Sequence, residues 1–382
     1  MAITVTEALE LEILNGFNVI AGKGGLSKPI TNVAVWDYET GDLIKKNFRQ
    51  GDFALSTLVA IKDNINELYQ SVEKMIEIGI TCLAIKNIYF DYIPDDVIKL
   101  ANKSDFPIML FENTFTEDVI VHVNKAIVKK QEHENLALQI NKILYDNLND
   151  ISIKKIALNI NSNFKEKNII AFCKKKKKKK LTVLEKRFHY EENDPFSKVI
   201  PYKDGYLVIN TFEEISNKDI DSFILRRMEW LGFSKKDYVI GISSLHESLT
   251  KLNNSIQECL YAYKYSITYN KDVSFFLKMG INKLFIPILD NPWVIKYYNE
   301  MIEPLIKYDE NNETELLKTA IKYIENNGDI KATAEELFQH GNTVRYRIDK
   351  INKIIKEHCQ SEHFYEELAV AVRIYTLLHC CL

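Results

Sequence analysis

Cysteine, glycine and proline are sparse in this sequence of 382 residues, which contains six, 13 and eight of them, respectively. No two cysteines form a Cys-x-x-Cys pair, so the sequence favours neither a zinc site nor a disulfide framework. We interpret the adjacent Cys380 and Cys381 as buried apolar side chains at a helix end, in preference to a redox pair. No stretch of about 18 apolar residues occurs, so we expect no membrane span. The first residues lack the basic start and apolar run of a secretory signal, and we expect a cytoplasmic protein.

An excess of positive charge is also missing, because 50 Lys and Arg residues face 53 Asp and Glu residues, for a formal net charge of −3. Seven of the lysines form one run, Lys174–Lys180, and without them the net charge is −10. A chain this acidic does not bind nucleic acid with its whole surface, so any DNA binding must be local. We interpret the lysine run as a solvated loop, in preference to a patch for nucleic acid or anionic lipid.

The first 115 residues alternate short apolar runs with amphipathic helices. Helical spacing predicts helices at Asn64–Ile78 and Asp95–Ala101. Runs rich in Val, Ile, Thr, Leu and Phe predict four strands, at Thr31–Trp36, Phe53–Val59, Thr81–Ile85 and Pro107–Phe111. This alternation indicates an α/β domain in which helices cover a parallel or mixed sheet.

Residues 117–149 predict one long helix or two, with narrow apolar stripes. The first stripe (Ile120, Val123 and Ile127) and the second (Leu136, Ile140, Ile143 and Leu144) fit equally a dimer seam and packing on the helix's own domain.

From residue 165 to residue 280, several strands surround two helices, at Asp219–Leu231 and Leu249–Tyr269. The predicted strands are Asn168–Phe172, Leu181–Leu184, Tyr206–Asn210, Tyr238–Ile242 and Val273–Leu277. This pattern suggests an α+β domain of ferredoxin-like type. After residue 283 the chain is predicted to be all helix, ending with an apolar helix at Tyr365–Leu378.

Sequence motifs of catalysis are missing. Gly22–Pro29 superficially resembles a phosphate-binding loop, but Lys28 is followed by Pro29 where such a loop has Ser or Thr and a helix, so a turn is the better interpretation. His-Glu-x-x-His, Gly-x-Ser-x-Gly and a Gly-x-Gly-x-x-Gly after a strand do not occur. We therefore predict no catalytic residue, no metal site and no cofactor, and hence no enzyme.

The C-terminal region carries the strongest pattern. Asp329 is placed to cap a short helix at Lys331–Phe338, in which Ala334, Leu337 and Phe338 are expected to be buried. Gln339-His340-Gly341 follows as a turn in which Gly341 is expected to supply positive φ, and Asn342 or Thr343 is expected to cap the next helix. That helix has an apolar face formed by Val344, Ile348, Ile351 and Ile355.

The opposite side of this last helix is polar and basic. Five basic residues between positions 342 and 356 face only Asp349. A short helix, a glycine-containing turn and a basic helix are typical of a helix-turn-helix, here at residues 329–356. We predict that Asn342, Thr343, Tyr346 and Lys350 reach base edges, that Arg345, Arg347 and Lys353 contact phosphate, and that Thr333 also belongs to the DNA-binding set. A basic helix in an ordinary bundle is the alternative.

The segment Ala332–Ile348, which reads ATAEELFQHGNTVRYRI, resembles the C-terminal helix-turn-helix of the PucR-type (purine catabolism regulator) family. One departure stands out, because Gly341 occupies a position where family members usually have Arg. Loss of that charge is expected to weaken a phosphate contact or to alter the preferred operator.

The resemblance extends over most of the chain. Gly25–Val35, Gly51–Thr57, Ile93–Ile98 and Phe106–Ile108 resemble the family's N-terminal sensor domain. Ile240–Ser243 and the helix through Ala262 and Tyr263 resemble its degenerate diguanylate-cyclase-like (GGDEF-like) domain, but the catalytic Gly-Gly-[Asp/Glu]-Glu-Phe loop is missing. The expected domains are therefore a sensor at 1–116, a helical linker at 117–164, a GGDEF-like domain at 165–282 and a helical domain at 283–382.

The resemblance implies a homodimeric transcription regulator that binds double-stranded operator DNA. It also implies a small-molecule effector, since relatives respond to purine-catabolic intermediates, sugar diacids or amino-acid-related metabolites. We place the effector at strand ends of the first domain, near Trp36, Asp37, Ser56 and Thr57, where local packing or capping is the alternative role. Two rival functions are a nucleotide-binding enzyme and a dimerisation module that does not bind DNA.

Overall fold

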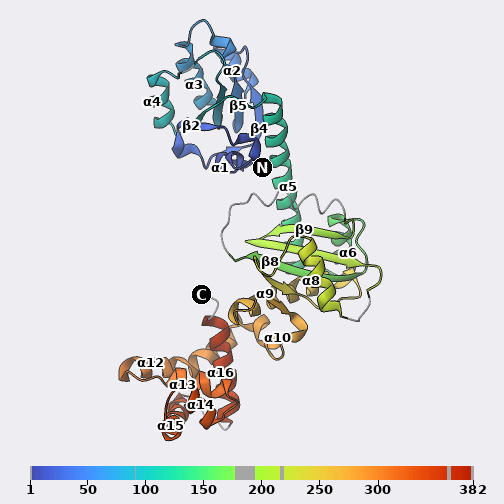
Figure 1. Cartoon of the computed structure of the whole chain (residues 1–382), viewed down its shortest axis with the longest axis vertical. Helices are drawn as coiled ribbons and strands as arrows, with labels where there is room; N and C mark the ends of the chain where they lie inside the picture. Colours follow the sequence, from blue (N-terminus) through green and yellow to red (C-terminus); the bar gives the residue numbers. More distant parts are fainter. Residues whose placement is uncertain (1, 91, 177–193, 216–218, 359–362, 380–382) are drawn as a thin grey trace. The chain divides into compact units, whose positions relative to one another are not determined.

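The structure, a computed structural model, describes residues 2–90, 92–176, 194–215, 219–358 and 363–379 (Figure 1). The chain divides into two compact units, of which the first ends at Ile140 and the second begins at Asn141. The predicted strand at Leu181–Leu184 and the Cys380-Cys381 pair lie outside the described residues. Cys82, Cys173 and Cys259 are buried and form no disulfide among the described residues.

The first unit is built on a five-stranded sheet in the order β2-β7-β6-β5-β4, in which only the β2–β7 pair is antiparallel. Its strands are β2 (Asn18–Ala21), β4 (Asn32–Val35), β5 (Asp52–Ser56), β6 (Cys82–Lys86) and β7 (Ile108–Phe111). Its helices are α1 (Val5–Leu9), α2 (Asp42–Asn47), α3 (Glu67–Ile78) and α4 (Asp95–Lys103), and β1 (Ile3–Thr4) pairs with β3 (Pro29–Ile30) in a separate small sheet. The predicted mixed α/β sheet is confirmed, although β2 was not predicted.

Helix α5 (Thr116–Tyr145) begins in the first unit, and α6 (Asp150–Ile160) follows in the second. Val123 and Ile127 of the first predicted stripe are buried in a core that also contains Phe111 and Val119. The first stripe therefore packs on its own unit, which is the second of the two alternatives left open by the sequence.

The second unit contains a five-stranded sheet in the order β12-β11-β8-β10-β9. Its strands are β8 (Lys167–Lys175), β9 (Ser197–Tyr202), β10 (Gly205–Phe212), β11 (Tyr238–Ile242) and β12 (Val273–Phe275), with α8 (Ile220–Trp230) and α9 (Leu252–Thr268) as its main helices. The prediction of β12 was too long, because the chain turns into a 3₁₀ helix at Phe276. Strand β9 was not predicted.

Gly241 of β11 allows α9 to pack closely on this sheet. A Cβ atom at Gly241 would lie only 2.1 Å from the backbone N of Tyr263 and 2.3 Å from the backbone O of Cys259. Only glycine fits such an approach of two backbones. The position of α9 against β11 is therefore set by one residue.

The C-terminal part of the second unit is all helix, as predicted. Its helices are α10 (Asn282–Phe285), α11 (Pro292–Met301), α12 (Glu303–Asn312), α13 (Leu316–Glu325), α14 (Ile330–Glu336), α15 (Gly341–His358) and α16 (Phe364–His379). They share one core with Ala262 of α9. Within the part of the chain that the structure describes, no helix is long and apolar enough to cross a membrane.

Candidate DNA-binding helix-turn-helix

Helix α14 starts where the sequence predicts. The Asp329 carboxylate accepts hydrogen bonds from the backbone N of Lys331 (2.8 Å) and of Ala332 (3.1 Å), which satisfies two N–H groups that the helix leaves unpaired. Thr333 is fully buried, and its hydroxyl donates to the backbone O of Asp329 at 2.6 Å. Thr333 therefore stabilises the start of α14, and its predicted place in the DNA-binding set is wrong because DNA cannot reach it.

The turn between α14 and α15 differs from the prediction in two ways. Phe338, not Gly341, has the positive φ (55°), and its side chain is 93% exposed instead of buried. The N–H groups of Phe338 and Gln339 donate to the carbonyls of Glu335 (3.2 Å) and Ala334 (2.9 Å), which is the Schellman ending of a helix. That ending requires a left-handed residue at position 338.

Helix α15 begins at Gly341, one or two residues before the predicted caps. The imidazole Nδ1 of His340 accepts a hydrogen bond from the backbone N of Asn342 at 3.2 Å. This bond leaves the Nε2–H of the exposed His340 available as a donor. His340 was not among the candidate residues predicted from the sequence, although it stands directly before α15 in the segment Ala332–Ile348.

The apolar face of α15 is confirmed. Val344, Ile351 and Ile355 are fully buried and Ile348 nearly so, all within the core of the helical bundle. This burial fixes which side of α15 remains outside. Four of the predicted DNA-contacting residues are on that exposed side: Asn342, Arg345, Tyr346 and Lys353.

Three other predicted residues of α15 are partly covered. Arg347 is held by α13, since its Nη1 donates to the Thr319 hydroxyl at 3.1 Å and lies 3.6 Å from the Glu315 carboxylate. The Lys350 ammonium lies 4.8 Å from the centre of the Tyr308 ring on α12. Arg347 and Lys350 thus have partners inside the bundle, while Thr343 is half-buried.

The four residues proposed for an effector lie at the carboxyl ends of β4 and β5. Trp36 is fully buried and its indole N–H donates to the backbone O of Glu39 at 2.6 Å. The buried Ser56 hydroxyl donates to the backbone O of Trp36 (2.7 Å) and accepts from the backbone N of Leu58 (2.8 Å). Trp36 and Ser56 therefore have packing and capping roles, whereas Asp37 and Thr57 are half-buried and keep contact with solvent.

One cluster in the second unit contains the residue types of a hydrolase. Ser244 Oγ lies 3.2 Å from His246 Nε2 and 2.5 Å from Glu258 Oε2. His246 Nε2 lies 3.1 Å from Glu258 Oε2. A catalytic triad needs the acid on Nδ1 and the serine on Nε2. Here both partners meet one nitrogen and the serine donates to the carboxylate, so the arrangement does not fit a proton relay. No group of three or more His, Cys, Asp or Glu side chains fit to hold a metal ion occurs among the described residues.

The geometry of α14, the turn and α15 defines the class of the C-terminal bundle, which is a helix-turn-helix domain. Comparison with known families identifies the domain further. Residues 316–374 match the PucR C-terminal helix-turn-helix domain, and residues 7–127 match the purine catabolism regulatory protein-like family. The resemblance to PucR-type regulators is thereby confirmed at both ends of the chain.

Two curated relatives are named as transcriptional activators. The proline-responsive transcriptional activator PutR of Bacillus subtilis is 36% identical over 118 residues, which cover 30% of this chain and 29% of PutR. The DNA-binding transcriptional activator AdeR of Bacillus subtilis is 22% identical over 142 residues, which cover 36% of this chain and 34% of AdeR. The matches thus span about a third of each relative.

Among solved structures, a regulator of polyketide synthase expression from Bifidobacterium adolescentis aligns with 63% of this chain and 98% of its own. The TM-score is 0.28 and the sequence identity is 12%.

Proposed function

We propose that this chain is a sequence-specific DNA-binding transcription regulator that inserts α15 into the major groove of double-stranded operator DNA. The observation that carries the proposal is the two-sided nature of α15. One face is buried in the bundle, and the other exposes Asn342, Arg345, Tyr346 and Lys353 directly after the turn. Amide and phenol groups read base edges, and Arg and Lys neutralise phosphates.

The test is fluorescence anisotropy with double-stranded DNA selected from a random pool by the full-length protein. Tyr346→Ala is expected to reduce the preference for selected over random DNA by about 1–3 kcal/mol, because Tyr346 reads bases. Lys353→Ala is the matched variant, and it should weaken binding to both DNAs alike because Lys353 contacts phosphate. A wild-type protein that binds no DNA above its affinity for random sequence would contradict the proposal.

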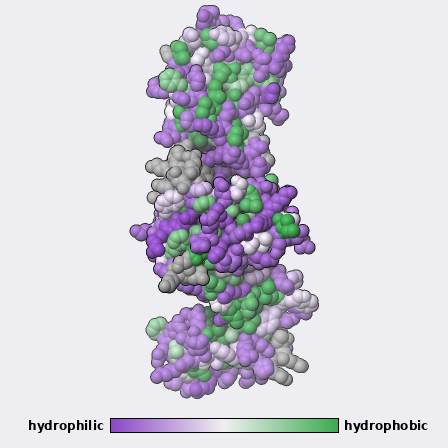
Figure 2. All heavy atoms as spheres, turned by 90° about the vertical axis from the view of Figure 1, so that its right-hand side faces the viewer, coloured by the Kyte–Doolittle hydropathy of each residue, from purple (hydrophilic) through white to green (hydrophobic). Residues whose placement is uncertain are grey.

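We also propose a homodimer, since helix-turn-helix proteins usually read two half-sites. An exposed apolar stripe on and beside α10 supports this, with exposed fractions of 65% for Leu277, 49% for Ile281, 68% for Leu284 and 43% for Ile288. Figure 2 shows apolar side chains gathered on the visible face of this part of the chain, on an otherwise mostly hydrophilic surface. Stripes of this kind mark interaction sites.

Sedimentation velocity tests the dimer. Leu284→Glu is expected to shift the protein toward monomer, whereas Val121→Glu, at an exposed apolar position of α5 (46% exposed), should leave the mass unchanged. A wild-type monomer at micromolar concentration, or an unchanged mass for Leu284→Glu, counts against this interface.

The finer assignments complete the proposal. We propose that the chain acts in the cytoplasm, responds to a small metabolite and has no enzymatic activity, and that the sheet of β8–β12 forms a degenerate GGDEF-like domain. One rival function is an enzyme. The arrangement of Ser244, His246 and Glu258 does not support it, because the serine donates to the carboxylate and no proton relay is formed. The rival of a dimerisation module does not explain the polar and basic outer face of α15.

A further inference from the structure

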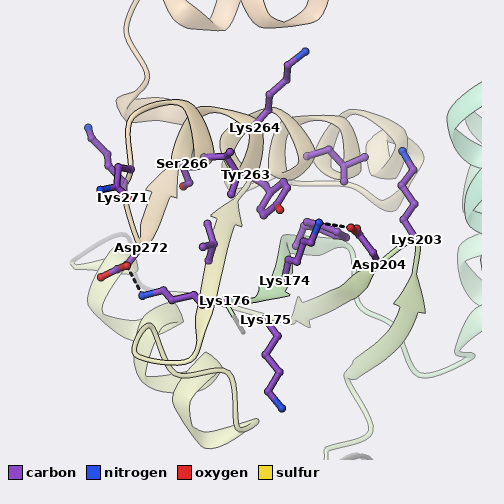
Figure 3. Close-up of a pocket in the computed structure, with 15 residues that line it drawn as sticks. Lys174, Lys175, Lys176, Lys203, Asp204, Tyr263, Lys264, Ser266, Lys271 and Asp272 are labelled. Carbon is purple, nitrogen blue, oxygen red and sulfur yellow. Dashed lines mark hydrogen bonds and ion pairs between the residues drawn. The ribbon is translucent and has the colours of Figure 1, made fainter. Parts of the chain in front are cut away.

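A basic cavity of about 920 Å³ lies between α9 and the end of β8 in the second unit. Six lysines and two aspartates contribute to its lining, for a formal charge of +4 within a chain of formal charge −3, although the Lys175 and Lys264 side chains point away from the space between β8 and α9 (Figure 3). Such a local concentration of one sign raises the local concentration of oppositely charged ligands. The cavity is therefore the place in the second unit to look for an anion site.

Strand alternation places two of the lysines on the floor of the cavity. Lys174 and Lys176 are two residues apart on β8 and its end, so both point to the face of the sheet that α9 covers. Figure 3 shows Lys174 turned toward Asp204 and Lys176 turned toward Asp272, on the side of the strand where Tyr263 and Ser266 lie. The Asp204 carboxylate raises the pKa of Lys174, so this ammonium remains charged.

The other four lysines have no carboxylate within ion-pair distance among the described residues. They are Lys175, Lys203, Lys264 and Lys271. Lys203 is exposed beside Asp204, at the turn between β9 and β10, and lies 5.5 Å from the centre of the Tyr202 ring. Because Lys175 and Lys264 point away from the cavity in Figure 3, Lys203 and Lys271 supply the positive charge at its rim that no carboxylate pairs within the described part of the chain.

The wall of the cavity is not only charged. Phe172 and Val239 come from the sheet, and Leu260, Tyr263 and Ile267 come from α9. The rings of Phe172 and Tyr263 meet edge to face, 4.9 Å apart. Small-molecule sites combine an apolar lining with a few charged groups that fix the orientation. An organic anion fits this lining better than a bare inorganic ion.

Helix α9 connects the cavity with the helix-turn-helix bundle. Tyr263, Ser266 and Ile267 face the cavity, whereas Ala262 lies in the bundle core, and Tyr261, Tyr265 and Tyr269 pack against that core. A ligand bound in the cavity therefore contacts a helix that also forms part of the bundle core.

From this arrangement we propose that the cavity binds a small organic anion with two or more acidic groups, and that its occupancy alters DNA binding through α9. The binding step stands alone, and only the coupling step rests on the proposed function. DNA phosphate is the rival occupant of these lysines.

The binding step is tested by isothermal titration calorimetry of the full-length protein with citrate, inorganic pyrophosphate and ATP, at an ionic strength matched with chloride. At least one of the two organic probes, citrate or ATP, is expected to bind with a defined stoichiometry, and pyrophosphate serves as the inorganic comparison. Lys203→Glu, which reverses an exposed charge at the mouth, should weaken that probe about tenfold or more. Lys236→Glu, at an exposed lysine that does not line the cavity, should have no effect.

The outcomes are distinguishable. No saturable binding of citrate or ATP, or equal binding by wild type and Lys203→Glu, would overturn the organic-anion site. If Lys203→Glu instead weakens DNA binding in the absence of a probe, the lysines contact DNA phosphate and the proposal is wrong. If the probe binds but the affinity for selected DNA stays unchanged, the proposed coupling of the cavity to DNA binding through α9 is wrong. A protein that binds the probe but no DNA refutes the proposed function and keeps the anion site.

Discussion

At the scale of single residues, Gly341 is the clearest departure from the PucR-type motif, and the structure shows what it leaves open. It is the first residue of α15, and a Cβ atom there meets nothing within 4 Å. An arginine would therefore fit at the start of the recognition helix, next to Asn342. Gly341 therefore lacks the positive charge that an arginine would place here, and no steric constraint requires a glycine at this position.

Gly341→Arg is accordingly expected to strengthen DNA binding about tenfold at low salt and to steepen the salt dependence by about one phosphate contact. Gly341→Ala is the control, since it should stabilise the helix by about 0.5–1 kcal/mol and leave DNA affinity unchanged. Anisotropy titrations at several salt concentrations measure both. Equal effects of Arg and Ala would mean that position 341 does not face phosphate.

Two arginines of α15, two positions apart, have opposite surroundings. Arg345 is exposed and its Nη1 lies 3.4 Å from the Asn342 side-chain oxygen, whereas the Arg347 side chain is 20% exposed and bonded to Thr319. Arg345→Ala should lower DNA affinity at nearly unchanged stability. Arg347→Ala should lower the free energy of unfolding by about 1 kcal/mol, because the hydrogen bond and the ion pair that join α15 to the start of α13 are lost.

Urea unfolding and DNA titration of the two variants separate these roles. Loss of DNA affinity in Arg347→Ala at unchanged stability would restore Arg347 to the phosphate-contacting set predicted from the sequence.

At the scale of elements, the loop after β11 is tied to α9 by the Glu258 carboxylate. Burial alone would raise the pKa of Glu258, but hydrogen bonds from His246 and from the hydroxyl and N–H of Ser244 together lower the pKa below 4.5. A carboxyl whose pKa is lower in the folded state stabilises the fold above its unfolded pKa, and this contribution disappears as the pH falls through the folded pKa.

Glu258→Gln should therefore lower the free energy of unfolding at neutral pH and reduce its fall between about pH 5 and about pH 3. Glu214→Gln, at an exposed carboxylate, is the control. Urea midpoints measured across this pH range decide the point. A slope identical to that of the wild type would show that Glu258 titrates alike in the folded and unfolded chain.

Elements with strong periodicity were predictable from the sequence. Strands β5 and β6 and helices α3 and α15 bury continuous runs or stripes, and hydrophobic spacing reports such burial directly. Strand β2 was missed because it lies at the sheet edge, where Asn18 is exposed and Val19 and Ile20 are only half-buried. Position 338 was misjudged because a phenylalanine gives no hint of a left-handed helix ending. The inward turn of Arg347 depends on Thr319, which only tertiary structure brings near.

At the scale of the whole molecule, the acidic net charge limits nonspecific binding to DNA, so affinity must come from the few cations of α15. Replacement of Lys177–Lys180 by glutamine should therefore leave the affinity for selected DNA nearly unchanged. Anisotropy titration with selected and random DNA checks this. A large loss on both would make the lysine run part of the DNA-binding surface.

Genome-wide occupancy of the full-length protein in its own host tests the central claim most directly. The account predicts discrete peaks that share a sequence with two half-sites, and loss of these peaks in the Tyr346→Ala variant. Peaks beside genes for uptake or breakdown of one compound would also indicate the class of effector. No enrichment with a soluble, folded protein, or peaks that persist unchanged in Tyr346→Ala, would contradict the assignment of α15 as the DNA-reading helix.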